Sequence, residues 1–188
     1  LVAELVKKYP HARHILASSV SVFGEPSSLP LSIESPTSAV TPYARTKLAA
    51  ERIIAACPNF AIIRFSSLIG EGMHAETFLP RILKAARSGK INIFGDGSRL
   101  QNYLSINDAA DMCIRALDDS NNFLTLGIGS RSFTNLEVAN FVADKTGAVI
   151  CHVDGEQGAS YVYHLGGAHS LGPCNHSLEA VIVRMLSI

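Results

Sequence analysis

The sequence predicts an α/β protein built on a parallel sheet, and three observations support this. Two apolar runs of strand length, "HILASS" at residues 14–19 and "NFAIIRFSSLIG" at residues 59–70, read as buried strands. A helix signal, "TPYARTKLAAE" at residues 41–51, lies between them. Strand and helix signals then keep alternating after residue 72. A strand, a helix and a second strand in that order are typical of a parallel sheet covered by helices.

The first elements are delimited by proline. A helix over about residues 1–9 is predicted to stop at Pro10 and to lead into the strand "HILASS". A long loop rich in Ser and Pro follows at residues 24–42, and its length favours a functional role. Thr41 is suited to cap the next helix and Pro42 to fill its first turn, so we expect a helix from there to about Ala56. The run "NFAIIRFSSLIG" is then expected as one strand.

The later elements are delimited mainly by glycine. "AETFLPRILKAARSG" predicts a helix ending at Gly89, and "VICHV" predicts a strand. Between them we first expect two strands joined by a Gly-Asp-Gly turn, and then a helix from near Asn107. A strand in "NFLTLGIGS" and a helix capped by Thr134 and closed by Gly147 are expected to follow. The tail "HSLEAVIVRMLSI" is expected as a last helix, with Ser177 or His176 near its cap.

Composition narrows the classes of partner. The chain has 188 residues, 47% of them hydrophobic, with 16 basic and 16 acidic side chains. This balance gives no general attraction for nucleic acid or an anionic membrane, and we expect neither as a partner. No apolar run reaches the ~20 residues of a membrane span. Four widely spaced cysteines (Cys57, Cys113, Cys151 and Cys174) indicate reduced thiols in a cytoplasmic protein, and the histidine spacings match no metal-ligand pattern, so no metal is expected.

Tyr43 and Lys47 are four residues apart and so share one face of the predicted helix. A nearby ammonium favours the ionised form of a phenol, which suits the pair to proton transfer. The spacing alone is also what an exposed, functionally silent helix pair would show. The pair gains weight from Ser18 and Ser19, which end the preceding strand at the sheet edge where open α/β proteins bind ligands.

Two segments together resemble a known family. "SSVSVFG" at residues 18–24 and "PYARTK" at residues 42–47 are similar to the Ser-x-x-Val-Tyr-Gly and Pro-Tyr-x-x-x-Lys motifs of the extended short-chain dehydrogenases/reductases, the NAD-dependent epimerase/dehydratase group. Phe23 stands at the usual tyrosine. "RFSSLIGEG" and "FGDGSRLQNYLSINDAADM" resemble later motifs of the same family. The resemblance implies the C-terminal half of a doubly wound, Rossmann-like sheet with a small mixed α/β substrate-binding region.

The resemblance also implies roles for particular residues. Tyr43 would transfer the proton, Ser19 would hydrogen-bond the reacting oxygen, and Lys47 would bind the nicotinamide ribose of NAD or NADP and favour the ionised phenol. The cofactor-binding residues would be Ser18, Tyr43, Lys47, Phe65 and Ser66, and the substrate-binding residues Ser19, Ser67 and Gln101. A nucleotide sugar is the implied substrate, and a homodimer is the implied assembly.

Three departures from the family pattern qualify these roles. The chain has no G-x-x-G-x-x-G turn, which in the family approaches the dinucleotide pyrophosphate, so we expect this chain alone to bind NAD weakly or not at all. Gln101 replaces the arginine that contacts the substrate diphosphate, and Arg99 points to the same side only if the strand is regular there. Residues 151–176 carry little of the Arg- and Pro-rich closing loop in which the family's substrate specificity resides.

The sequence therefore predicts a partial NAD-binding domain at residues 1–71 and a substrate-binding region at residues 72–188. Val20 and Ser21 stand where dehydratases of the family have Asp-Glu, which favours an epimerase or reductase over a 4,6-dehydratase. The alternative is a non-catalytic nucleotide- or protein-binding member, or an inactive fragment, of the same fold. An intact set of Ser19, Tyr43 and Lys47 argues against that alternative.

Overall fold

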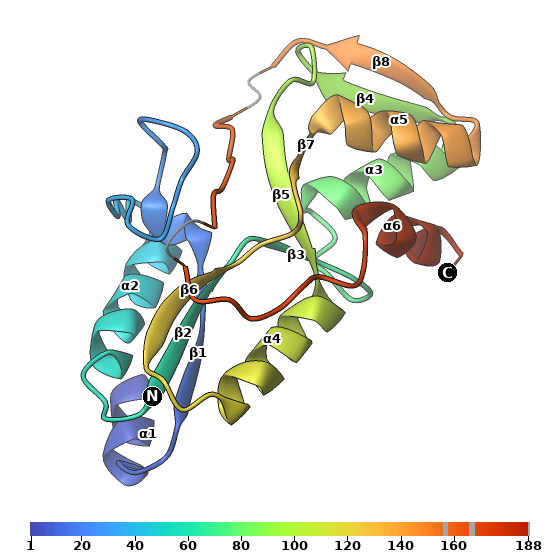
Figure 1. Ribbon diagram of the computed structural model, residues 1–188. Coiled ribbons are helices and arrows are strands. Elements are labelled where there is room, and N and C mark those ends of the chain that lie inside the picture. Colours follow the sequence, from blue (N-terminus) through green and yellow to red (C-terminus); the bar gives the residue numbers. More distant parts are fainter. Residues whose placement is uncertain (156–157, 166–167, 188) are drawn as a thin grey trace.

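A three-stranded parallel sheet forms the first part of the molecule (Figure 1). The computed structural model describes residues 1–155, 158–165 and 168–187. In the sheet, β1 (His14–Ser19) pairs with β2 (Phe60–Phe65), which pairs in turn with β6 (Phe123–Gly127). Helix α2 (Pro42–Ile54) covers one face and α4 (Ile106–Asp118) the other. The predicted parallel α/β class is confirmed.

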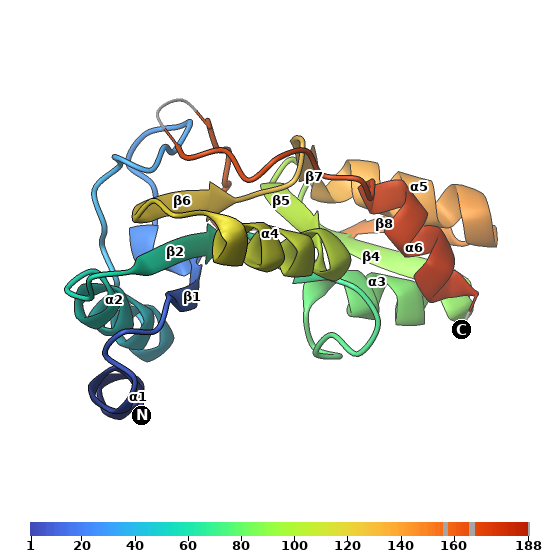
Figure 2. The same cartoon turned by 60° about the horizontal axis from the view of Figure 1, so that its bottom comes forward.

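Helix α2 begins as its sequence predicts. The Thr41 hydroxyl accepts a hydrogen bond from the Ala44 amide at 3.1 Å, and Pro42 occupies the first helical turn. The helix ends at Ile54, two residues before the predicted end. Helix α1 (Val2–Lys8) ends ahead of Pro10 and packs beside α2. Both N-terminal helices therefore lie on the same side of the sheet (Figure 2).

The single strand expected at residues 59–70 is wrong, because the chain forms two strands there. β2 ends at Phe65, the Ser66 amide makes one more hydrogen bond to Gly127 O at 2.9 Å, and β3 (Ser67–Ile69) enters a different sheet. In that sheet β3 runs parallel to β5 (Leu100–Ser105), and β5 runs antiparallel to β7 (Ser132–Thr134), a strand too short to be predicted. The β2 ladder ends where β6 ends, so Ser66 is the crossing point between the two sheets.

The later elements form a second layered region. β4 (Lys90–Phe94) and β8 (Val149–Val153) make a parallel pair, and helices α3 (Phe78–Arg87), α5 (Asn135–Thr146) and α6 (Leu178–Leu186) surround this end of the molecule (Figure 2). These elements match the predicted ones within a few residues. The capping box at Thr134 and the left-handed Gly147, with φ of 74°, start and stop α5.

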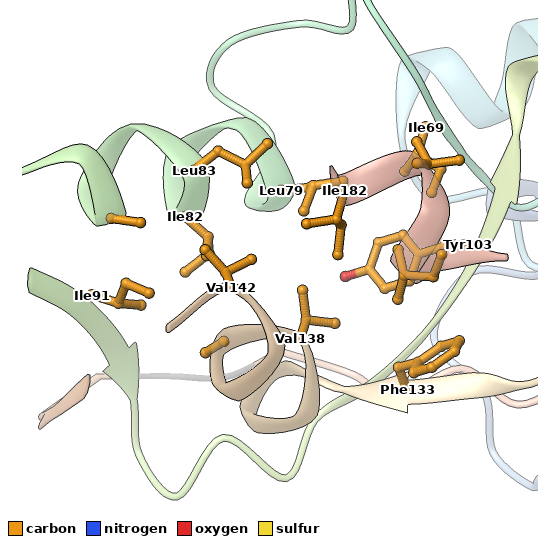
Figure 3. Close-up of a cluster of buried hydrophobic side chains, with 14 of the residues drawn as sticks. Ile69, Leu79, Ile82, Leu83, Ile91, Tyr103, Phe133, Val138, Val142 and Ile182 are labelled. Carbon is orange, nitrogen blue, oxygen red and sulfur yellow. The ribbon is translucent and has the colours of Figure 1, made fainter. Parts of the chain in front are cut away.

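A large apolar core joins α3, α5 and α6 to β4 and β5 (Figure 3). Its fully buried members are mainly aliphatic, and the labelled side chains converge from helices and strands on one centre. The buried residues of this cluster, called the aliphatic core below, are Ile69, Leu79, Ile82, Leu83, Ala86, Ile91, Ile93, Tyr103, Phe133, Val138, Ala139, Val142, Ala148, Leu178, Val181 and Ile182.

The chain passes between the two regions several times. After residue 71 it builds β4 and β5, and it then returns to add α4 and β6 to the first sheet. The C-terminal segment also returns, since the Leu31 amide donates to Val162 O and the His164 amide to Leu31 O, both at 2.7 Å. The boundary at residues 71/72 remains a sequence-based proposal, and the first sheet draws its third strand from beyond it.

Candidate active site

The carboxyl ends of β1 and β2 place the predicted site residues side by side. Ser18 and Ser19 lie opposite Arg64 and Phe65 in the parallel ladder. Ser19 Oγ accepts a hydrogen bond from the Ser21 amide at 3.2 Å and caps the 3-10 helix η1 (Val20–Phe23). Ligands of open α/β sheets bind at this edge, so the strands present Ser19, Phe65 and Ser66 at a suitable place.

Helix α2 brings Tyr43 and Lys47 to the same strand. Lys47 Nζ donates to Ala17 O at 2.8 Å and lies 5.6 Å from the centroid of the Tyr43 ring. The ammonium therefore stands between the phenol ring and the strand that ends in Ser19. The Tyr43 side of this arrangement is open to solvent, because Tyr43 is 56% exposed.

A cleft of about 270 Å³ lies in front of the strand ends. It brings together five of the predicted site residues: Ser19, Phe65, Ser66, Ser67 and Gln101. The other lining residues are Val20, Ser21, Arg99, Asn102, Tyr161 and Tyr163. Ser18, Tyr43 and Lys47 lie behind or beside this cleft and do not line it.

The part of the cleft next to the start of β5 contains both Gln101 and Arg99. Gln101 Nε2 donates to Asn135 Oδ1 at 3.1 Å, which fixes the amide against the start of α5. Arg99 Nε donates to Ala159 O at 2.9 Å. Both side chains border the same cavity, so a guanidinium remains close to the position where the family has its arginine.

Polar atoms without a protein partner face this part of the molecule. Within the described ranges, Ser21 Oγ and Ser66 Oγ are buried and make no hydrogen bond. A buried hydroxyl without a partner is unfavourable unless a ligand or water satisfies it. Both serines line the cleft, so these two hydroxyls are available to a bound molecule.

Two tyrosines of the C-terminal segment line the cleft and were not found from the sequence. The Tyr161 hydroxyl donates to Gly24 O at 3.2 Å. Burial raises the pKa of both the Tyr161 and the Tyr163 phenols, so both remain protonated at neutral pH. They are hydrogen-bond donors rather than bases. No motif marks them, because residues 151–176 do not follow the family pattern.

A buried ionic network behind the cleft was also missed. Arg64 Nε and Nη2 donate to Glu51 Oε1 and Oε2 at 3.0 and 2.8 Å, and Ser18 Oγ donates to Glu51 Oε1 at 2.5 Å. Glu51 and Arg64 are each only 5% exposed. The signal in the sequence was Arg64 itself, because a cation inside the apolar run "FAIIRF" requires a buried anion.

Two further site types find no support in the described part of the chain. It contains no group of three His, Cys, Asp or Glu side chains arranged to hold a metal ion. It also contains no helix with the length and apolar character needed to cross a membrane.

Comparison with known proteins identifies the family. The family model described as "NAD dependent epimerase/dehydratase family" matches residues 1–129. The chain belongs to this family. The resemblance seen in the motifs around Ser19 and Tyr43 is thus confirmed, and the observed parallel α/β fold matches part of the Rossmann-like structures of the family.

Individual relatives have related activities in their names. The chain is 30% identical over 168 residues to a UDP-glucose 4-epimerase of Lactobacillus helveticus, covering 75% of this chain and 51% of that protein. It is 29% identical over 174 residues to a UDP-glucose 4-epimerase of Lacticaseibacillus casei, covering 78% of this chain and 52% of that protein. The chain thus spans about half the length of these relatives.

Solved structures show the same fold. A dTDP-glucose 4,6-dehydratase from Bacillus anthracis in complex with NAD has a TM-score of 0.83 at 22% identity, covering 99% of this chain and 64% of that one. A UDP-glucuronic acid 4-epimerase from Bacillus cereus in complex with UDP-glucuronic acid and NAD has a TM-score of 0.82 at 19% identity, covering 99% and 65%. At these identities the likeness is one of fold.

Proposed function

We propose that the protein is an NAD(P)-dependent nucleotide-sugar epimerase or reductase that uses Ser19, Tyr43 and Lys47. The observation that carries the proposal is the placement of Lys47, whose ammonium bonds to Ala17 O and lies 5.6 Å from the Tyr43 ring centroid. A chain that only bound a nucleotide would have no use for a phenol and an ammonium held together beside Ser19. The UDP-glucose 4-epimerases among its relatives support the same class.

The proposed chemistry oxidises a sugar carbinol to a carbonyl. The hydroxyl proton leaves to Tyr43 as the carbon loses a hydride, and the reverse step returns the proton. The nicotinamide supplies the hydride acceptor when it is bound. Ser19 would donate a hydrogen bond to the reacting oxygen, and Lys47 would stabilise the phenolate form of Tyr43.

The residues at the strand ends fit the nicotinamide half of such a cofactor. Ser66 Oγ is buried, lines the cleft and has no partner in the described ranges, so it can serve a ribose hydroxyl or an amide. Phe65 offers an apolar surface beside it. Lys47 would hold the ribose and Ser18 would support the strand end. The chain has no glycine-rich turn for the pyrophosphate, and we expect weak or no NAD binding by residues 1–188 alone.

The substrate end supports an anionic, two-part ligand. Arg99 lines the cleft with Gln101 and Ser67, and it also lines a neighbouring cavity of about 650 Å³. That second cavity contains Phe78, Arg81, Asn92 and Phe94 among its walls. Aromatic rings and amides suit a nucleobase, and guanidinium groups suit a diphosphate. We propose that Arg99 takes over the diphosphate contact that the family's arginine makes at the position of Gln101.

Turnover by the full-length protein tests the proposed function. Tyr43→Phe removes the phenolic proton site and keeps the ring, so we expect at least a 100-fold loss of kcat with NAD binding preserved. Arg45→Ala, on the same helix turn but without a predicted role, serves as the control. Unchanged turnover in Tyr43→Phe would refute the proposed role of Tyr43. No turnover of nucleotide sugars by the wild type would favour the alternative, a non-catalytic nucleotide- or protein-binding member.

We also propose a homodimer formed through the N-terminal helices. The exposed apolar side chains Leu1, Leu5, Tyr9 and Val40 lie on or beside α1 and α2, and nothing in the described chain covers them. Sedimentation of the full-length protein tests this, and a Leu5→Glu variant should shift the equilibrium toward monomer.

A further inference from the structure

The carboxylate of Glu51 ties together the three elements that carry the candidate active site. Glu51 lies on α2, Ser18 on β1 and Arg64 on β2, and each of the other two side chains donates to it, at distances of 2.5 to 3.0 Å. All three residues are buried. The two donors are opposite one another in the β1–β2 ladder. One residue of the helix is therefore hydrogen-bonded to both strands, one residue before the positions that line the cleft.

Glu51 also continues a regular series along α2. Tyr43, Lys47 and Glu51 follow at intervals of four, so they lie along one face of the helix on successive turns, from exposed Tyr43 to buried Glu51. Lys47 bonds to Ala17 O, and Glu51 accepts from the Ser18 hydroxyl. Successive turns of the helix are thus attached to successive residues of β1, and the next residue of that strand is Ser19.

The other side of the network holds the backbone that follows Ser19. The Arg64 guanidinium carbon lies 4.9 Å from the centroid of the Phe23 ring, in a cation–π contact. Phe23 is buried in η1, the turn that Ser19 caps. Arg64 itself directly precedes Phe65 and Ser66. Glu51, Arg64 and Phe23 therefore surround the strand ends from behind, on the side away from solvent.

A buried ion pair contributes little net stability to a fold. Desolvation of the two charges offsets much of their attraction, and apolar side chains of similar volume often stabilise a fold as well or better. A bidentate carboxylate–guanidinium pair does fix distance and orientation closely. We infer that Glu51 is a positioning residue of the proposed reaction: it holds Tyr43 and Lys47 in register with Ser19 and Ser66. This inference rests on the proposed function.

The test compares turnover of full-length variants. Glu51→Gln removes the charge at nearly constant volume, and we expect kcat to fall about 10- to 100-fold, as small misplacements of reacting groups do. KM for a UDP-hexose should stay within about threefold, because the cleft residues that bind it are unchanged. Ser18→Ala removes one donor and leaves the ion pair, so its loss of kcat should be smaller.

Val142→Ala is the matched control. Val142 is buried in the aliphatic core, remote from the strand ends, and its truncation lowers stability without touching the network. Melting temperatures are measured for both variants, and turnover is measured where both are folded. A kcat loss in Glu51→Gln no greater than that in Val142→Ala would overturn the inference.

Two further variants distinguish failure of the positioning role from failure of the proposed function. In a Tyr43→Phe background, Glu51→Gln should cause little additional loss, because the group that it positions is already gone. Full turnover in Tyr43→Phe alone would refute the proposed function, whereas loss there with normal kcat in Glu51→Gln refutes only the positioning role. If Glu51→Gln does not fold, Glu51→Asp decides: it keeps Arg64 paired but shortens the reach, and normal kcat in it would overturn the inference.

Discussion

The region behind the ends of β1 and β2 and the aliphatic core are built on different principles. Behind the ends of β1 and β2, a carboxylate, a guanidinium and a hydroxyl are buried together. Between α3, α5 and α6, the interior is formed by aliphatic side chains in mutual contact (Figure 3). The contrast shows where exact placement is needed and where close packing is enough.

The two regions also stabilise the fold in different ways. Apolar packing tolerates small adjustments and contributes in proportion to the area removed from water. A buried ion pair contributes little net stability while intact but is costly to break on one side. Single substitutions should therefore have sharper effects behind the strand ends than in the aliphatic core. Variants of Arg64, Ile182 and Tyr103 test this, and a variant of Asp108 extends the test to a second buried carboxylate, from the largest expected effect to the smallest.

Arg64→Met should have the largest effect on stability. It leaves the Glu51 carboxylate buried with only Ser18 as a partner, which costs roughly 3–5 kcal/mol of unfolding free energy. Urea denaturation measures the loss. A double variant, Glu51→Leu with Arg64→Met, should recover most of it, because neither charge then remains buried. A loss below about 1 kcal/mol in the single variant would contradict the difference drawn between the two interiors.

Ile182→Ala should rank next. Ile182 is 0% exposed in the aliphatic core, and truncation to alanine leaves a cavity that costs roughly 2–5 kcal/mol. Turnover of the folded protein should be unchanged, unlike that of the Glu51 variants. Val183→Ala, on the neighbouring exposed position of α6, is the control and should change stability by less than about 0.5 kcal/mol.

Asp108→Asn should give a pH-dependent loss. Burial acts to raise the pKa of Asp108, but hydrogen bonds from the His176 side chain and from the Asn175 and His176 amides outweigh it and hold the pKa below its usual value. A lowered pKa means that the stabilisation is complete above about pH 4 and is lost as the pH falls through the folded-state value.

The size of that loss follows from hydrogen bonds to a charged acceptor. We expect wild type to exceed Asp108→Asn by roughly 1.5–3 kcal/mol at neutral pH, with the difference shrinking below about pH 4. Denaturation at several pH values measures it. Asp111→Asn, which affects only a 3.9 Å ion pair with Arg115 on the surface, should show almost no difference. A gap that widens in acid would refute the assignment.

Tyr103→Phe should have the smallest effect. The Tyr103 hydroxyl is buried in the aliphatic core without a partner in the described residues, and burial raises the pKa of this phenol. Removing it should leave stability unchanged or increase it by up to about 1 kcal/mol. By comparison, Tyr161→Phe loses a bond to Gly24 O and should cost about 0.5–1.5 kcal/mol. Marked destabilisation by Tyr103→Phe would show that its hydroxyl is satisfied in solution.

The ends of the helices could be predicted because capping residues, proline and glycine act on the residues next to them in the chain. Thr41 and Pro42 start α2, and the capping box at Thr134 and Gly147 delimit α5, as the sequence indicated. The pairing of strands could not be predicted in the same way. β4 and β5 are joined by a Gly-Asp-Gly turn, yet β4 pairs with β8 and β5 with β3 and β7. Those choices depend on contacts between residues far apart in the chain.

The candidate site was predicted where motifs exist. Ser19, Phe65, Ser66, Ser67 and Gln101 do converge on one cleft, while the proposed roles of Tyr43 and Lys47 remain predictions. Glu51 was missed because a glutamate on a helix normally faces solvent, and only its spacing from Lys47 pointed to the sheet. Tyr161 and Tyr163 were missed because a backbone pairing with Leu31 brings them in.

The return of β6 to β2 also constrains how the protein is synthesised and folds. β2 ends at Phe65, whereas its outer neighbour begins at Phe123. The residues between them, which include β3, β4, β5 and α4, must leave the ribosome before the sheet can be completed. Contacts of such long sequence separation slow folding. Until β6 has been made, the edge of β2 that it covers is unpaired, and an unpaired apolar strand edge makes a growing chain prone to aggregation.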